Sequence, residues 1–398
     1  MTSADLRAAI SRELPTLREI RHDLHRHPEL GYQERRTSGV IRTELTRLNI
    51  AHKADLAGGT GVVGFLPATE PGGESKKAVA LRADIDALPI LEQTGLDYAS
   101  CTPGLMHACG HDGHTTILLG AARVLQTMRR PRPVILMFQP AEEGGGGADR
   151  LCKDGALDGT LIGPPAEMAF GLHGWPDLTL GHVATRPGPL LASTDEIRVV
   201  IKGVQSHGAY PHYSRDTIVA AAHCIVALQS VVSRNISPLD ACVVTIGKIE
   251  AGTATNIIPQ QASFIGTIRA LSEPVRATAR ARVREIIENT AKALGCTAEV
   301  EINTGYPVTF NDPALTDRFF KLAKAALGDQ RAGLVPNPTM GGEDFSYYAQ
   351  RVPAVFFCLG LKPEDRESYP TLHQPDFDFN DDALGLGVEM MCRLATEM

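Results

Sequence analysis

The sequence predicts an α/β fold, a mostly parallel sheet with helices on both faces, interrupted by a smaller inserted α+β domain. Apolar stretches typical of buried strands alternate with amphipathic stretches typical of helices. The alternation stops near residue 186 and resumes after Gly305. Between these points the expected order is β-α-β-β-α-β, the ferredoxin-like pattern. We therefore assign residues 1–185 and 305–398 to the larger domain and residues 186–304 to the insertion.

The larger domain begins with two expected helices. Apolar residues from Leu6 to Leu24 recur at helical spacing, and Ser3 or Asp5 can cap this helix. The second helix covers Glu34 to Leu48. Further helices are expected at 117–128 and 315–327. The expected buried strands are 61–66, 78–81, 133–138, 167–172 and 353–359.

The inserted domain supplies its own complete set of elements. Its expected strands are Glu196–Ile201, Cys242–Ile249, Ala262–Ile268 and Ala298–Ile302. Its expected helices are Asp216–Val232 and Pro274–Leu294.

Composition limits the class of protein. Of 398 residues, 43% are hydrophobic and 21% charged, and the formal net charge is −7. These values are typical of a globular protein, and with no long basic run we expect neither nucleic acid nor membrane as a partner. No signal peptide or membrane-spanning segment is expected. Eight scattered cysteines indicate reduced thiols, and hence a cytoplasmic location, rather than a disulfide framework.

The stretch from Met106 to Thr116 gathers metal-binding side chains within a few residues. Cys109 and His111 lie where a loop enters an apolar helix. Thiolate and imidazole are ligands for zinc and similar metals. An alternative is that Cys109 acts as a nucleophile or redox thiol, with His107 or His111 as its base. The histidines at 22, 25 and 27 form a weaker second metal candidate.

Further candidate ligands follow the expected strands. Asp86, the pair Glu142 and Glu143, and His173 lie at or beyond strand ends, and His373 follows the last strand in a loop. In parallel α/β sheets, ligands bind beyond the carboxyl ends of the strands. We therefore expect these side chains to meet at one edge of the sheet.

Five residues are our candidate metal ligands: Cys109, His111, Glu143, His173 and His373. Five ligands exceed the four of a closed zinc site and suit two divalent ions with a shared ligand and a bridging water.

The acidic neighbours have other expected roles. We assign Glu142 to proton transfer, although the order of Glu142 and Glu143 does not by itself decide which binds metal. Asp84 and Asp86 are expected to support the ligands, and Asp112 and His114 to serve loop and helix structure.

The inserted domain carries three candidate substrate residues. His207 follows a strand and could donate to a developing oxyanion, and Arg269 could clamp a substrate carboxylate. Asn256 is a polar residue at a strand edge. Each could equally be an ordinary surface residue.

These motifs together resemble the two-metal amidohydrolases and peptidases that include aminoacylases, glutamate carboxypeptidase, hippurate hydrolase and the indole-3-acetyl-amino-acid hydrolases. The centre with cysteine resembles the hippurate and indole-acetyl branch, whereas other branches carry aspartate as the bridging ligand. The matching segments are 23–31, 82–89, 109–114, 139–144, 206–207, 341–346 and 373–380.

The resemblance implies a zinc-peptidase-like fold and metal-dependent hydrolysis of N-acyl-amino acids, such as hippurate, N-acetyl or indole-acetyl compounds. It implies zinc, manganese, cobalt or nickel as the metal, and a homodimer formed through the inserted domain. His207 would then polarise the scissile carbonyl in the partner subunit's active site, and Asn256 and Arg269 would hold the substrate.

Two alternatives stay open. A dipeptidase or carboxypeptidase could use the same scaffold, and a requirement for a free amino group in the substrate would distinguish it. A metal-dependent binding or regulatory dimer without catalysis is the alternative from another class, and the intact Glu142 speaks against it.

Overall fold

The computed structural model describes residues 2–398 and separates them into two compact units. The first unit extends to Gly188 and also includes Phe310–Pro336 and Asp344–Met398. The second unit comprises Pro189–Thr309 and Asn337–Glu343. The short segment Asn337–Glu343 thus belongs to the second unit, although the first unit's chain flanks it on both sides.

An eight-stranded sheet forms the centre of the first unit, in the order β1-β2-β4-β3-β5-β16-β6-β15. Strands β4, β3, β5 and β16 run parallel as neighbours, whereas β1, β2 and β6 pair antiparallel with β2, β4 and β16. The strands are β1 (Ala51–Leu56), β2 (Gly61–Leu66), β3 (Ala78–Asp84), β4 (Val134–Gln139), β5 (Ala166–Thr179), β6 (Val183–Thr185), β15 (Ala332–Leu334) and β16 (Ala354–Lys362). The predicted mostly parallel α/β sheet is confirmed.

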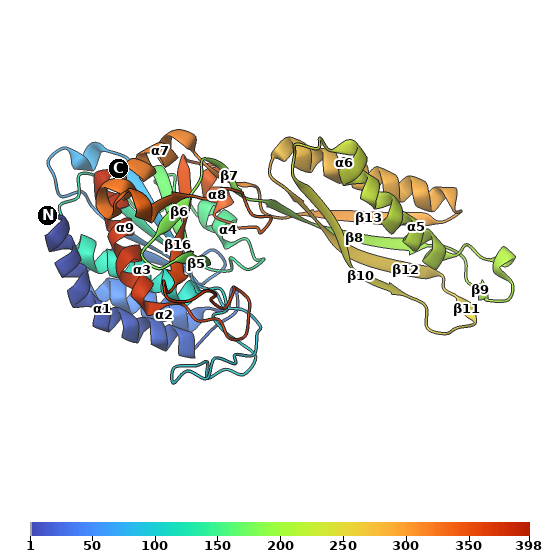
Figure 1. Cartoon of the computed structure of the whole chain (residues 1–398), viewed down its shortest axis with the longest axis horizontal. Helices are drawn as coiled ribbons and strands as arrows, with labels where there is room; N and C mark the ends of the chain where they lie inside the picture. The colour runs from blue at the N-terminus through green and yellow to red at the C-terminus, as the bar shows by residue number, and fades with distance from the viewer. Residues whose placement is uncertain (1) are drawn as a thin grey trace. The chain divides into compact units, whose positions relative to one another are not determined.

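Helices cover both faces of this sheet. Leu81 and Ala83 of β3 join the core beneath α3 and α9, whereas Arg82 points to the opposite face and binds Asp344 just before α8. Helices α1, α3 and α9 lie side by side (Figure 1). The helices are α1 (Ser3–Arg26), α2 (Arg35–Arg47), α3 (His111–Leu125), α4 (Gly147–Lys153), α7 (Pro313–Leu327), α8 (Ser346–Ala349) and α9 (Leu384–Glu397).

Several element bounds differ from the sequence prediction. Strand β5 does not end near Leu172 but continues to Thr179, because its pairing with β16 extends that far. Helix α3 begins at His111 rather than near Ile117. Thr2, rather than Ser3 or Asp5, caps α1. Strand β1 was missed because it is a polar edge strand whose exposed and half-buried residues alternate.

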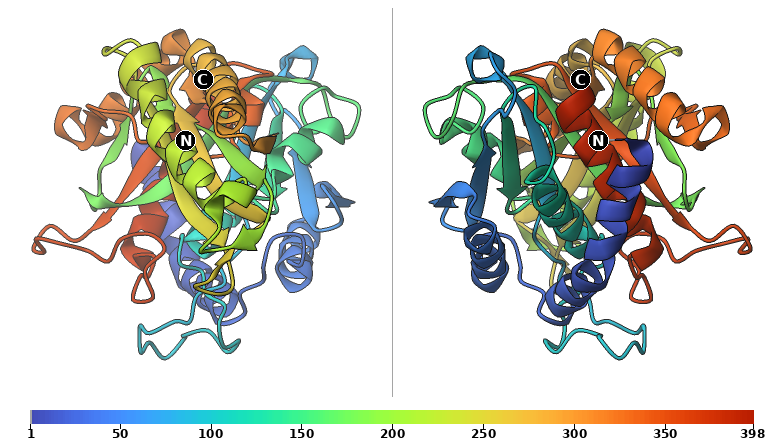
Figure 2. Two further views of the ribbon diagram at one scale, coloured as in Figure 1. Left: turned by 90° about the vertical axis from the view of Figure 1, so that its right-hand side faces the viewer. Right: turned by 90° about the vertical axis from the view of Figure 1, so that its left-hand side faces the viewer.

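The second unit is a four-stranded antiparallel sheet with two helices. The strand order is β10-β12-β8-β13, which confirms the predicted ferredoxin-like insertion. Figure 2 shows α5 and α6 side by side over the strands. Its elements are β8 (Ser193–Lys202), β9 (Ser206–His207), α5 (Thr217–Ser230), β10 (Cys242–Ala251), β11 (Ile257–Ile258), β12 (Gln261–Ala270), α6 (Glu273–Ala293) and β13 (Thr297–Thr304). Two short strands complete the chain's elements, β7 (Gly188–Leu191) and β14 (Thr309–Asn311).

Helix α5 corrects the prediction that no segment is long and apolar enough to span a membrane. It continues through a π-helical turn, Val231–Asn235, and the combined helix Thr217–Asn235 is long and apolar enough to span a membrane by length and composition. The core helix of a folded domain meets the same criterion. Ala220, Cys224 and Leu228 of α5 are fully buried in the core of the second unit.

Close packing of α3 generates a stability prediction. A Cβ on Gly113 would lie 2.4 Å from Phe379 Cγ, whereas a Cβ on Gly39, inside α2, would meet nothing within 4 Å. We expect Gly113→Ala to lower the free energy of unfolding by about 1–3 kcal/mol through overpacking. The matched control Gly39→Ala should raise it by up to about 1 kcal/mol through helix propensity. Urea unfolding midpoints measure both, and a Gly113→Ala protein as stable as the control would contradict this packing.

Candidate metal centre

The centre is built around Cys109, which lies directly before α3. Gly110 takes a left-handed conformation (φ +81°), so the chain turns sharply and His111 starts the helix. The backbone of His373 donates a hydrogen bond to the Ala108 carbonyl oxygen (2.8 Å), which ties the late loop to this turn. Segments far apart in sequence therefore meet beside one thiol.

The five candidate ligands form two groups that share Cys109. The ligand atoms of Cys109, His111 and His173 all lie within 4.8 Å of one another, and so do those of Cys109, Glu143 and His373. Cys109 Sγ lies 3.3 Å from His173 Nε2, and Glu143 Oε1 lies 3.1 Å from His373 Nε2. This arrangement offers two neighbouring cation positions with a common thiolate.

Hydrogen bonds behind the donors orient them. Asp86 Oδ1 accepts from His111 Nδ1 (3.1 Å), and its Oδ2 accepts from the Glu143 backbone N–H (3.0 Å). His173 Nδ1 donates to the Gly174 carbonyl oxygen (2.8 Å). In both imidazoles the Nε2 atom is thereby directed to the centre.

Glu142 and Glu143 follow a strained turn at the end of β4. Ala141 has φ +52°, a region that residues other than glycine rarely adopt. The Ala141 N–H donates to Glu34 Oε1 (2.9 Å), and this hydrogen bond holds the turn in place. Glu142 is 7% exposed, and its carboxylate lies with that of Glu143 and the ring of His111 in one group of donors.

The electrostatics of the centre favour cations. Burial alone would lower the pKa of His111, but Asp84 and Asp86 raise it to about 10. Burial, Glu143 and Glu142 raise the pKa of the Cys109 thiol far above its usual value. A thiolate here therefore needs added positive charge, which argues against Cys109 as a free nucleophile.

The donor set fits divalent metal ions. His111 Nε2 is buried without a hydrogen-bond partner among residues 2–398. Burial and the neighbouring His114 hold the pKa of His173 well below its usual range, so this imidazole is neutral as a ligand requires. Thiolate, imidazole and carboxylate together suit zinc and the neighbouring transition metals.

His114 and Asp112 are occupied by other contacts. His114 Nδ1 donates to Asp84 Oδ1 (2.7 Å), and its Nε2 accepts from the Gly174 N–H (2.8 Å). Asp112 Oδ2 accepts from Arg21 (3.1 Å) and His25 (2.8 Å). Both side chains therefore brace the first turn of α3.

His22 and His25 of α1 belong to the same set of contacts at the start of α3. Besides Asp112, His25 binds Glu92, and the two carboxylates overcome burial to raise the pKa of His25 to about 9. His22 stacks on Tyr98. Within the described chain no group of metal-ligating atoms includes His22, His25 or His27.

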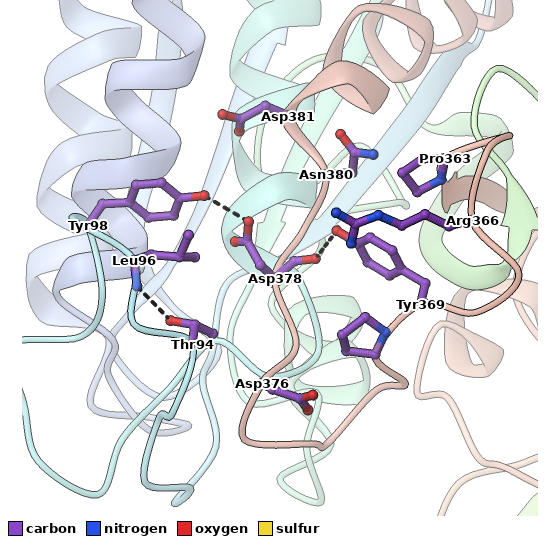
Figure 3. Close-up of a pocket in the computed structure, with 11 residues that line it drawn as sticks. Thr94, Leu96, Tyr98, Pro363, Arg366, Tyr369, Asp376, Asp378, Asn380 and Asp381 are labelled. Atoms are coloured by element: carbon purple, nitrogen blue, oxygen red, sulfur yellow. Dashed lines mark hydrogen bonds between the residues drawn. The ribbon is translucent and has the colours of Figure 1, made fainter.

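A cavity of about 420 Å³ adjoins the same network (Figure 3). Tyr98 and Tyr369 lie on either side of Asp378 and donate to its side chain and its backbone oxygen, respectively. Arg21 pairs with Asp378 and Asp381. Because Asp378 and Asp381 are already paired with Arg21, we interpret this cavity as part of the network that supports α3.

The three substrate candidates belong to the second unit. His207 is exposed in β9, opposite Ile257 of β11, and its Nδ1 accepts from the Ala209 N–H (3.0 Å). The Asn256 carbonyl accepts from Gly208 (2.7 Å), so His207 and Asn256 are neighbours. Arg269 lies in β12 and is half-buried, and its side chain has no hydrogen bond or ion pair among residues 2–398.

Glu34 is the residue that sequence reasoning missed. It was predicted only as a helix start, yet it is fully buried and binds both Ala141 and Thr60. Burial raises its pKa to about 7. The sequence around Glu34 does not indicate that its partner is Ala141, 107 residues further along the chain.

Residues 80–397 match the family model described as peptidase family M20/M25/M40. The chain is 39% identical over 383 residues to IAA-amino acid hydrolase ILR1-like 4 of Arabidopsis thaliana, covering 95% of this chain and 84% of the relative. It is 38% identical over 374 residues to an N-acetyldiaminopimelate deacetylase of Bacillus cytotoxicus, covering 94% and 95%.

Solved structures agree with these relatives. The YXEP protein of Bacillus subtilis, described as a dinuclear metal binding peptidase, is 33% identical with a TM-score of 0.81, and 98% of each chain is covered. A putative aminohydrolase from methicillin-resistant Staphylococcus aureus is also 33% identical, with a TM-score of 0.88, and the match covers 98% of this chain and 97% of that one.

The shared position of Cys109 predicts unequal effects on metal content. We expect Cys109→Ala to lose both ions, because both groups contain its thiol, and His373→Ala to lose about one ion per chain. Elemental analysis after dialysis measures the content, with Cys392→Ala, a buried thiol of α9, as the control. Two tightly held ions in the Cys109→Ala protein would contradict the shared ligand.

Proposed function

Because this chain belongs to peptidase family M20/M25/M40, we propose that it hydrolyses the amide bond of N-acyl-amino acids, releasing a carboxylic acid and an amino acid. It is a hydrolase that acts on amides and uses two divalent metal ions. The names of its relatives, an IAA-amino acid hydrolase and an N-acetyldiaminopimelate deacetylase, support this substrate class. The observation that carries the proposal is the pair of donor groups sharing Cys109, with Glu142 beside them.

In this proposal Cys109, His111 and His173 hold one ion, and Cys109, Glu143 and His373 hold the other. The bound ions would supply a nucleophile at neutral pH and polarise the amide carbonyl. Zinc is the first candidate, because thiolate and imidazole suit it, with manganese, cobalt and nickel as alternatives.

Glu142 performs the proton transfer. Its carboxylate lies within 4.8 Å of the donor atoms of His111 and Glu143, and the Asp344 N–H approaches its Oε1 at 3.4 Å. It accepts the proton of the attacking water and delivers that proton to the leaving nitrogen. Glu143 would instead hold a metal ion, because Asp86 fixes its backbone N–H and its carboxylate groups with Cys109 and His373.

The second unit completes the active site in a homodimer. His207 reaches the partner subunit's site and polarises the scissile carbonyl, and Arg269 and Asn256 hold the substrate. The exposed position of His207 supports this, since only its own loop contacts its ring among residues 2–398. The unpaired guanidinium of Arg269 suits the carboxylate of an amino acid. Eight free cysteines support a cytoplasmic location.

A dipeptidase or carboxypeptidase is the second candidate, favoured by the peptidase description of the YXEP structure. Benzoyl-, acetyl- and indole-acetyl-amino acids, tested beside an unblocked dipeptide, separate the two. Cleavage of the dipeptide alone would favour the second candidate.

Replacing Glu142 tests the mechanism. Glu142→Gln keeps the shape of the side chain but cannot accept the proton, so we expect kcat on the cleaved N-acyl-amino acid to fall by about 10²–10⁴-fold. Metal content should stay at the wild-type level, and Glu167→Gln, an exposed glutamate of β5, should keep full activity. A fully active Glu142→Gln enzyme would remove Glu142 from the mechanism.

Subunit exchange tests the dimer. Glu142→Gln and His207→Ala chains should each be inactive, but mixed dimers contain one site with both groups intact, so about one quarter of wild-type activity should return. Mixing the Glu142→Gln chain with a Glu142→Gln/His207→Ala chain should restore no activity, because no site then has an intact Glu142. Sedimentation checks for a mass near twice 42.7 kDa. Mixed dimers without activity would show that His207 does not act across the interface.

A further inference from the structure

A cavity with two arginines in its lining lies in the first unit. It is about 370 Å³ in volume and opens between α2 and the turn that joins β1 to β2. Arg35 and Arg42 of α2 line it from one side, and Gly58 and Thr60 of the turn line it from the other. Tyr32 also contributes to the wall.

Positive charge gathers at this cavity although the chain as a whole carries a formal charge of −7. The exposed side chain of Arg35 has no hydrogen bond or ion pair among residues 2–398, and Arg42 Nη1 pairs with Asp55 Oδ1 at 3.6 Å. Arg150 of α4 stacks on Tyr32, with its Cζ 4.2 Å from the ring centroid. Two guanidinium groups thus line the cavity beside one carboxylate, that of Asp55, and a third guanidinium lies against Tyr32 of its wall.

The arginines converge from two separate elements. A Cβ on Gly58 would lie 3.0 Å from Arg150 Nη1, so glycine leaves room for the Arg150 guanidinium at the rim. The second carboxylate nearby, that of Asp154, accepts the Ala57 N–H (2.6 Å) and holds the turn in place. Asp154 is therefore engaged by the backbone, and the guanidinium groups of Arg35 and Arg42 are available to an anion from solution.

Two hydrogen-bond paths join the cavity wall to the turn at Glu142 and Glu143. Thr60 Oγ1 donates to Glu34 Oε2 (2.7 Å), and Glu34 Oε1 accepts the Ala141 N–H (2.9 Å). The Tyr32 hydroxyl donates to the Gly145 carbonyl oxygen (2.6 Å). A ligand pressing on Thr60 or Tyr32 therefore acts on both ends of the segment 141–145.

We infer that this cavity binds the phosphate group of a small phosphorylated molecule, and that occupancy stiffens the segment 141–147. Guanidinium groups bind phosphate oxygens in pairs with matching geometry. The volume exceeds that of one phosphate and leaves room for a small organic part. The binding step is independent of the proposed function, whereas any effect on turnover rests on it.

Titration calorimetry of the metal-loaded enzyme with inorganic phosphate tests the site, with sodium chloride at matched ionic strength as the blank. We expect Arg35→Ala/Arg42→Ala to weaken binding by about tenfold or more. Arg47→Ala, an exposed arginine on the same helix outside the cavity, should bind phosphate as the wild type does. Equal binding by the double variant, or no binding by the wild type, would overturn the inference.

Hydrogen exchange tests the coupling without reference to activity. Phosphate should slow exchange in the peptide that contains residues 141–147 in the wild type but not in the double variant. Thr60→Val should bind phosphate yet lose much of this protection, because its path to Glu34 is gone. Phosphate binding that leaves this peptide unchanged would overturn the coupling, and a failure of amide hydrolysis would leave both readouts intact.

Discussion

The two hydrogen bonds accepted by Asp86 hold the centre together. One carboxylate oxygen fixes the ring of His111, and the other fixes the backbone of Glu143. These residues come from different segments and belong to different donor groups around Cys109. One side chain therefore orients a member of each group.

Buried carboxylates surround Asp86, and buried arginines pair with several of them. Arg82 pairs with Asp84 and Asp344, and together with the histidines it holds the pKa of Asp84 well below its usual range despite burial. His25 and Arg21 play the same part for Asp112. The inner layer differs, because Glu143 pairs with the imidazole of His373 and Cys109 lies against the imidazole of His173, and an imidazole that binds metal is neutral. Bound metal supplies that charge, and so links metal affinity to the folding of this edge of the sheet.

The turn that carries Glu142 is strained and is supported by residues outside the two donor groups. Ala141 adopts a left-handed backbone, and Glu34 and Tyr32 hold the turn through Ala141 and Gly145. Strain of this kind persists only where neighbours over-determine it. The same supports form the wall of the basic cavity, which makes the turn the natural point for a ligand to influence Glu142.

Sequence by itself determined the fold class, the inserted ferredoxin-like domain and the chemistry of the donors, because hydrophobic period and residue type are local properties. It predicted Cys109 and His111 at a helix entrance and carboxylates after strands. Only the tertiary structure decided that Cys109 is shared, that His173 lies inside β5, and that both nitrogens of His114 are occupied. It also decided that Glu34 reaches Ala141. These contacts join segments separated by up to hundreds of residues, and no local pattern encodes which distant partner a buried polar atom will find.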